Sequence, residues 1–248
     1  MNLDRVIAVR NNKTVYRDGD RCIKTFNGEY SKTDVLSEAL CQARVEQIGL
    51  NVPKILEVTM LDGRWAIVSE YIRGKTLAQL MEQNPERKEA YIDLLTELQL
   101  SVHQKTAPVP ERLADKLSRR LSHVQADETI RKTLKRHIEA MPECSTLCHG
   151  DFNPSNIILT ESEVPYILDW SQAALGDAAV DAACTYLYFR FGGQEAEAER
   201  YLDSFCRKSH VARQDVQKWI PVVAGLQLVR GDPSECEHFL QSIGEEER

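Results

Sequence analysis

The sequence lacks long hydrophobic runs, CxxC pairs and an excess of basic charge. No apolar stretch approaches the ~20 residues that a membrane span requires, and Met1 to Arg10 carries charged residues where a signal peptide would have its apolar core. The seven cysteines are scattered and odd in number, which favours reduced thiols over a disulfide framework. We therefore expect a cytoplasmic protein that does not associate with membranes.

The charge balance excludes one class of partner. The chain has 31 Lys and Arg against 38 Asp and Glu, a net charge of -7. Without a basic cluster, nucleic-acid binding has no electrostatic support, and a small-molecule substrate fits better. With 248 residues, 42% of them hydrophobic, the chain should fold as one large domain or two lobes. The sequence leaves the oligomeric state open.

A zinc site is also weakly supported. Cys144, Cys148 and His149 lie close together in the sequence, but no fourth ligand follows at a matching spacing. The pattern favours buried thiols that flank a strand.

Two Asp-Gly pairs predict β-hairpins in the first ~70 residues, because both positions of such a pair tolerate positive φ. They lie between apolar runs at 14–17 and 21–26, and at 56–61 and 65–70. A helix is expected between the hairpins, capped by Thr33 or Asp34 and running to about Ile48, with Leu36 and Leu40 on its buried face. This part should form a small antiparallel sheet with one helix.

After Gly74 the pattern becomes helical. Strand signals in this half surround one motif, at 146–148, 157–159 and 166–168. The chain is thus predicted to be α+β and two-lobed, with a β lobe over residues 1–73, a helical lobe over 74–248 and a ligand cleft between them. Helices are expected at 76–83, 86–102, 111–124, 129–141, 178–191, 195–208 and 215–229.

The motif in the second half has the residues that phosphoryl transfer needs. Asp151 follows His149-Gly150 and can accept the proton of a hydroxyl, while Asn156 and Asp169 offer the oxygen ligands that Mg²⁺ prefers. A short strand pair between Asn156 and Asp169 would bring the two ligands together. The arrangement predicts a kinase site.

A lysine and a glutamate in the first half complete this set. Lys24 lies in a predicted strand, where a lone lysine is unusual unless it points into a cleft. Glu38, fourteen residues later in the predicted helix, can hold its ammonium, as nucleotide kinases require. Glu46 competes for this role but lies near the end of the helix, so we favour Glu38.

These motifs resemble the aminoglycoside phosphotransferase family, also called the phosphotransferase enzyme family. His149-Gly150-Asp151, Asn156 and Ile167-Leu168-Asp169-Trp170 match its central pattern. Residues 174–183 resemble its Gly-Asp-Pro-x-x-Asp-Leu-Ala segment, with Ala178 in place of proline, residues 69–77 resemble its hinge, and 98–103 resemble its Leu-x-x-Leu-His helix end. The resemblance covers nearly the whole chain.

The resemblance implies a protein-kinase-like fold, related to choline kinases, and Mg²⁺-dependent transfer of a phosphate from ATP or GTP to a small-molecule hydroxyl. It implies Asp151 as the base, Asn156 and Asp169 as metal ligands, and Asp181 as a brace for the catalytic loop. No GxGxxG precedes the lysine, so residues 10–13 would cover the phosphates. The nucleotide site implied by the resemblance comprises Lys24, its partner Glu38, and the hinge residues Glu70, Tyr71 and Ile72.

Three other functions compete with an antibiotic kinase. A choline, amino-alcohol or sugar kinase would use the same motif on another acceptor, which segments 105–142 and 186–240 are expected to line. A regulatory pseudoenzyme that only binds nucleotide would not need Asp151. A metallophosphatase would need further His and Asp ligands that the sequence does not supply.

Overall fold

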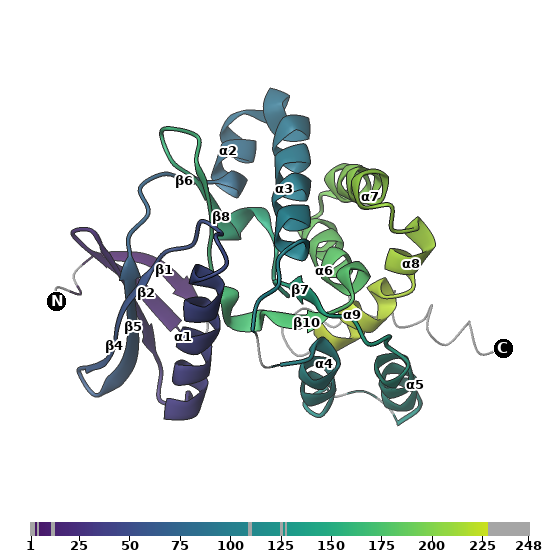
Figure 1. Cartoon of the computed structure of the whole chain (residues 1–248), viewed down its shortest axis with the longest axis horizontal. Helices are drawn as coiled ribbons and strands as arrows, with labels where there is room; N and C mark the ends of the chain where they lie inside the picture. Colours follow the sequence, from purple (N-terminus) through teal and green to yellow (C-terminus); the bar gives the residue numbers. More distant parts are fainter. Residues whose placement is uncertain are drawn as a thin grey trace. The chain divides into compact units, whose positions relative to one another are not determined.

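A computed structural model describes residues 3, 5–10, 13–108, 111–124, 126 and 128–227 of the chain. The chain divides into two compact units: Met1–Gln83 with Pro154–Gln172, and Asn84–Asn153 with Ala173–Arg248. Strands dominate the first unit and helices dominate the second (Figure 1). The predicted α+β class is confirmed. The lobe boundary at residue 73 stays a prediction, because 74–83 and 154–172 group with the first unit.

An antiparallel sheet of five strands forms most of the first unit, in the order β1-β2-β3-β5-β4 (Figure 1). Both predicted hairpins are confirmed, and Gly19 and Gly63 adopt the positive φ values, 60° and 75°, that their turns require. β1, which the sequence did not predict, pairs with β2. The strands are β1 (Val6–Arg10), β2 (Lys13–Asp18), β3 (Arg21–Phe26), β4 (Ile55–Leu61) and β5 (Arg64–Glu70).

Helix α1 (Lys32–Glu46) packs against β4 and β5, but with a different face from the one predicted. Leu36 and Leu40 are exposed, whereas Val35 and Ala39 are buried in a cluster with Phe26. The prediction that Leu36 and Leu40 lie on the buried face was wrong. The buried face of α1 instead includes Glu38. The N-cap is Ser31, which forms a capping box with Asp34 and so satisfies free N–H groups of the first turn.

A second, three-stranded sheet completes the first unit. It has the order β6-β8-β9 and contains the predicted pair of strands after Asn156. A 3-10 turn, η2, precedes β8, and another, η3, follows β9 and packs on α1. The elements are β6 (Lys75–Thr76), α2 (Leu77–Gln83), η2 (Pro154–Asn156), β8 (Ile157–Leu159), β9 (Pro165–Ile167) and η3 (Trp170–Gln172).

Helix α6 (Ala178–Phe191) forms the centre of the second unit. Most of its residues are buried, and it packs against α7, α8 and α9. Around it lie η1 (Pro85–Arg87), α3 (Lys88–His103), α4 (Leu113–Leu121), α5 (Glu128–Glu139), β7 (Thr146–Cys148), β10 (Ala174–Gly176), α7 (Glu195–Ser209), α8 (Arg213–Gln217) and α9 (Ile220–Gln227).

The single helix predicted over 215–229 is wrong, because the segment forms α8 and α9 with a break after Gln217. Pro221 lies in the first turn of α9, where its missing N–H does no harm, whereas it would interrupt one continuous helix. Leu228 and Val229, at the end of the predicted helix, lie outside the described residues.

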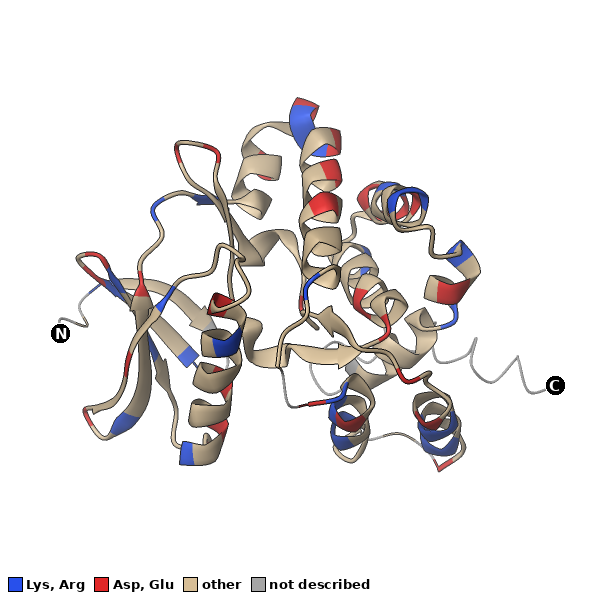
Figure 2. Cartoon of the chain, in the orientation of Figure 1, with Lys and Arg blue, Asp and Glu red and all other residues tan. Residues whose placement is uncertain are grey.

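Helices α3 and α7, which pack together, both carry acidic and basic residues (Figure 2). Lys88 pairs with Glu197 at 2.8 Å and Lys208 with Glu97 at 2.6 Å, so ion pairs link the two helices. None of the helices in the described part of the chain combines the length and hydropathy that a membrane crossing needs.

Replacing Gly74 by alanine tests how closely the chain approaches β8. A Cβ atom at Gly74 would lie 2.1 Å from the carbonyl oxygen of Leu159, a contact that backbone atoms cannot relieve cheaply. We expect Gly74→Ala to lower the free energy of unfolding by about 2–3 kcal/mol, as overpacked sites do, measured by urea denaturation. Gly28→Ala is the control, since its Cβ meets nothing within 4 Å. Equal stability of the two variants would contradict this packing.

Candidate active site

Strands β2 and β3 place two lysines on the face of the sheet that carries α1. In their register, Lys13 lies opposite Phe26 and Val15 lies opposite Lys24. Directly opposed residues, and residues two apart on one strand, share a face. Because Phe26 packs against α1 residues, Lys13 and Lys24 lie on the α1 face as well.

Glu38 of α1 holds both lysines. Its Oε1 accepts from Lys24 Nζ at 2.8 Å and its Oε2 accepts from Lys13 Nζ at 2.7 Å. The glutamate is 7% exposed, so two ammonium groups offset the cost of burying its charge. Glu46, the competing candidate, instead accepts from the Ile55 N–H at 2.8 Å. The geometry supports Glu38 as the partner of Lys24.

Lys24 also contacts a second predicted site residue. Its Nζ lies 3.3 Å from Asp169 Oδ1, so the ammonium bridges two carboxylates. Burial would lower the pKa of Lys24, but the charges of Asp169 and Glu38 outweigh burial and raise the pKa above its usual value. Lys24 therefore stays protonated and can bind an anion.

Strands β8 and β9 bring the two predicted metal ligands together. They pair with Ile157 opposite Ile167, and the Leu168 N–H donates to the Asn156 carbonyl at 2.8 Å. Asp169 follows with φ 56°, a left-handed conformation that aspartate tolerates better than most residues. Its side chain is partly exposed and offers a carboxylate, a ligand that suits Mg²⁺.

The predicted hinge lies at the end of β5 and just beyond it. The Glu70 N–H donates to the Lys54 carbonyl and the Tyr71 N–H donates to the Asp20 carbonyl, each at 2.9 Å. Both amides therefore serve the sheet. The hydrogen-bonding edge of an adenine would have to pair with hinge carbonyls or with the N–H of Ile72. The predicted contact between hinge and base is therefore limited to these groups.

The predicted base, Asp151, belongs to the second unit, on a loop that Asp181 of α6 braces. Asp181 Oδ1 accepts from the Gly150 N–H at 2.7 Å and Oδ2 accepts from the His149 N–H at 3.3 Å. Gly150 has φ 77°, which a glycine adopts without strain. The predicted bracing role of Asp181 is confirmed.

Neighbouring side chains orient Asp151, which is itself exposed. Asn153 Nδ2 donates to Asp151 Oδ1 at 3.0 Å and also to its carbonyl. His149 is fully buried, stacks edge-on against Phe152, and accepts the Asp151 N–H on Nδ1 at 3.3 Å. His149 therefore supports the loop that carries Asp151.

Sequence reasoning missed several residues of these sites. Asn153 could have been found, since an asparagine two residues from an aspartate often bonds to it locally. Lys13 was predicted only as the last residue of the phosphate-covering turn, whereas it begins β2 and pairs with Glu38. The contact of His103 was missed as well: its Nε2 lies 2.9 Å from Asp181 Oδ2. Residues 11 and 12 of the predicted phosphate-covering turn lie outside the described residues.

The three zinc candidates of the sequence, Cys144, Cys148 and His149, do not form a group of neighbouring ligand atoms in the described part of the chain. Among the described residues, one group has metal-ligand chemistry: His103, Cys148 and Asp181, with ligand atoms within 4.8 Å of one another. Asp181 already accepts four N–H groups, from His103, Gln99, His149 and Gly150. Burial raises the pKa of the Cys148 thiol well above its usual value, so the thiol does not ionise readily. The group is a hydrogen-bonded core.

A comparison of the sequence with models of protein families identifies the family of this chain. The model of the phosphotransferase enzyme family matches residues 5–217. The chain belongs to this family. Membership supports a phosphotransferase that acts on small molecules. No protein of curated function matches the chain in a sequence comparison.

Solved structures similar to this phosphotransferase family member include a choline/ethanolamine kinase family protein from Mesorhizobium loti (17% identity, TM-score 0.60, covering 99% of this chain and 87% of that one). A thermostable mutant of aminoglycoside phosphotransferase APH(4)-Ia with AMP-PNP and hygromycin B has 14% identity, TM-score 0.67 and coverages of 97% and 91%. LicA in complex with AMP has 13% identity, TM-score 0.70 and coverages of 99% and 92%. At such identities these likenesses show the fold, and the predicted protein-kinase-like fold is confirmed.

Replacing Asp181 by asparagine should reveal its charge as a pH-dependent contribution to stability. Burial would raise the pKa of Asp181, but hydrogen bonding to His103 and nearby charges outweigh burial and lower it. The ionised carboxylate therefore stabilises the fold above the unfolded pKa of about 4, and this contribution is lost as the pH falls through the lower folded pKa. Asp181→Asn should cost on the order of 3 kcal/mol at pH 7 and progressively less below about pH 4.

Urea denaturation from pH 7 to pH 3 measures this difference. Asp177→Asn is the matched control, because asparagine can still cap α6 by accepting the Ala179 N–H, which Asp177 accepts at 2.8 Å. A gap between wild type and Asp181→Asn that stays constant over the whole pH range would refute the role of the charge.

Proposed function

We propose that this protein is a Mg²⁺-dependent kinase that transfers the γ-phosphate of ATP, or GTP, to a hydroxyl of a small molecule. One observation carries the proposal: the ammonium of Lys24 lies between the carboxylates of Glu38, at 2.8 Å, and Asp169, at 3.3 Å. A protonated lysine beside a metal-binding carboxylate is the arrangement that holds nucleotide phosphates in kinases. Because ATP is the co-substrate, we place its action in the cytoplasm.

Each site residue then has a distinct task. Lys24, kept in place by Glu38, binds the α- and β-phosphates. Asn156 and Asp169 would hold Mg²⁺, which neutralises charge on the β- and γ-phosphates. Asp151 takes the proton of the acceptor hydroxyl as the oxygen bonds to the γ-phosphorus and the bond from that phosphorus to the β–γ bridging oxygen breaks.

The hinge would hold the base of the nucleotide. With the amides of Glu70 and Tyr71 engaged in the sheet, the Ile72 N–H and the hinge carbonyls are the backbone groups that could pair with an adenine or guanine edge. Backbone groups alone discriminate weakly between these bases, so both nucleotides stay candidates.

The organisation of Asp151 favours an enzyme over a regulatory pseudoenzyme. Asn153 orients its carboxylate at 3.0 Å, and Asp181 fixes the preceding amides. A protein that only binds nucleotide would have no need to position an exposed carboxylate in this way. Similar structures include a protein of the choline/ethanolamine kinase family and a hygromycin B complex, so amino alcohols and aminoglycosides are the first acceptors to test.

The function is tested by ADP formation from Mg-ATP with a panel of choline, ethanolamine, simple sugars, hygromycin B and other aminoglycosides. We expect at least one acceptor to support turnover, and Asp151→Ala to lower kcat by ~10²–10⁴ through loss of the base while nucleotide affinity is kept. Asn153→Ala is an intermediate variant, since it keeps the base but not its orientation. Undiminished turnover by Asp151→Ala would sink the proposed mechanism.

Asp169→Ala should separate the metal from the lysine. The variant should lose the Mg²⁺-dependent part of ATP affinity, because a charged ligand is removed, while Lys24 still pairs with Glu38. Titration calorimetry with ATP, with and without Mg²⁺, measures this part directly. Asp62→Ala in the β4–β5 turn serves as a control of equal charge change. Wild-type Mg-ATP affinity in the Asp169 variant would rule out the assignment.

A further inference from the structure

Four polar side chains lie buried together in the second unit, outside the nucleotide and metal residues. Gln99 of α3, Asp181 and Thr185 of α6 and Tyr201 of α7 are each at most 1% exposed. Buried polar groups lower stability unless they are hydrogen-bonded, and a satisfied network fixes the elements that supply its members. No sequence pattern indicates this cluster, because Gln99 lies about a hundred residues from Tyr201 in the chain.

The directions of the hydrogen bonds follow from the chemistry of Asp181. An ionised carboxylate only accepts, so Gln99 must turn its amide nitrogen toward Asp181 Oδ2, at 3.1 Å. The same nitrogen donates to Thr185 Oγ1 at 3.2 Å. The amide oxygen is then left facing Tyr201, whose hydroxyl donates to it. Burial raises the pKa of Tyr201 well above its usual value, so this hydroxyl keeps its proton.

The network ends on the backbone on both sides of Asp151. Thr185 Oγ1 uses its one hydrogen to donate to the Phe152 carbonyl at 2.7 Å. Asp181 accepts the Gly150 N–H at 2.7 Å. The residues immediately before and after Asp151 are therefore held by two side chains that Gln99 connects.

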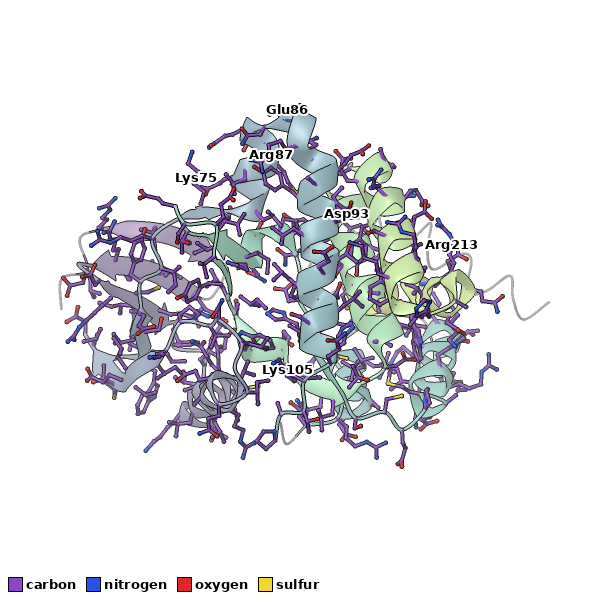
Figure 3. The ribbon with its side chains drawn as sticks, turned by 45° about the horizontal axis from the view of Figure 1, so that its top comes forward. Lys75, Glu86, Arg87, Asp93, Lys105 and Arg213 are labelled. Atoms are coloured by element: carbon purple, nitrogen blue, oxygen red, sulfur yellow. The ribbon has the colours of Figure 1, made fainter. Side chains whose placement is uncertain are left out.

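Helix α7 carries Tyr201 and is fastened to α3, which carries Gln99. Lys88 pairs with Glu197 at 2.8 Å, and Ser204 Oγ donates to Asp93 Oδ1 at 2.6 Å. Figure 3 labels Asp93 on the long helix α3. These contacts lie on either side of Tyr201 along α7, so its hydroxyl is kept against the Gln99 amide.

We propose that Gln99 and Tyr201 are positioning residues for phosphoryl transfer: Tyr201 sets the orientation of the Gln99 amide, and Gln99 with Thr185 and Asp181 fixes the backbone that presents Asp151. This inference rests on the proposed function for its kinetic consequence. The loss of the Tyr201 O–H leaves the buried Gln99 amide oxygen without its donor, so the amide is held less firmly and its nitrogen restrains Asp181 and Thr185, and with them the loop, less well.

Tyr201→Phe and Tyr91→Phe form a matched pair. Each removes one hydroxyl from a buried tyrosine of the second unit, but Tyr91 lies in the first turn of α3, where the Arg87 guanidinium lies over its ring at 5.0 Å. With Mg-ATP and the most active alcohol of the panel, Tyr201→Phe should lower kcat about tenfold, equivalent to about 1.4 kcal/mol, and leave the KM for ATP within about twofold. Tyr91→Phe should change neither constant.

A second pair tests the same network without altering Tyr201. Thr185→Val should lower kcat by a similar factor, whereas Thr185→Ser, which keeps the hydroxyl, should restore it. Thr96→Val is the control, since the buried Thr96 hydroxyl bonds only to the Ile92 carbonyl of its own helix. These variants decide the question if Tyr201→Phe does not fold.

Amide hydrogen exchange gives a readout that needs no turnover. The Gly150 N–H should exchange about tenfold faster in Tyr201→Phe and Thr185→Val than in wild type, and at the wild-type rate in Tyr91→Phe and Thr96→Val. If wild type turns over no acceptor but this exchange pattern is found, the proposed function fails and the network stands. If Tyr201→Phe and Thr185→Val match their controls in kcat and exchange, the network inference fails and the proposed function is untouched.

Discussion

The carboxylate of Asp181 is the constraint on which the second unit depends. A buried charge needs a full set of hydrogen bonds, and Asp181 obtains them from His103, Gln99 and the backbone of His149 and Gly150. Two successive amides can point at one carboxylate only if the chain turns sharply, which the positive φ of Gly150 permits. The shape of the loop that carries Asp151 thus follows from satisfying one acid on α6.

The first unit also contains a buried acid whose charge is compensated by its partners, but the result is different. Glu38 is buried and paired with two lysines, but Lys24 keeps a further carboxylate, Asp169, at 3.3 Å. The hydrogen bonds of Asp181 hold the backbone of a loop. The ion pairs around Lys24 instead join side chains, which phosphates and a metal ion could rearrange. Asp181 therefore fixes a loop, whereas Glu38 belongs to a charged site whose side chains could change their ion-pair partners.

Structural features that depend on residues close together in the sequence were predicted correctly. The Asp-Gly turns located both hairpins, and helix α6 was predicted over the residues it occupies because Asp177 caps it and apolar residues fill it. The buried face of α1 was missed because an ion pair, not leucine content, turns Glu38 inward. The bonds of Gln99, His103 and Tyr201 were missed because their partners lie about 80 to 100 residues away in the chain.

Candidate residues for phosphoryl transfer can be predicted from the sequence, whereas the identity of the acceptor cannot. Phosphates and Mg²⁺ demand charge, which few residue types supply. In the described parts of 105–142 and 186–240, Glu111 pairs with Lys116 and Arg119, Glu128 with Lys132, and Glu199 with Arg213. Charge in the described parts of these segments therefore does not single out an acceptor, and the shape and hydrogen bonds of a binding site are not encoded in composition.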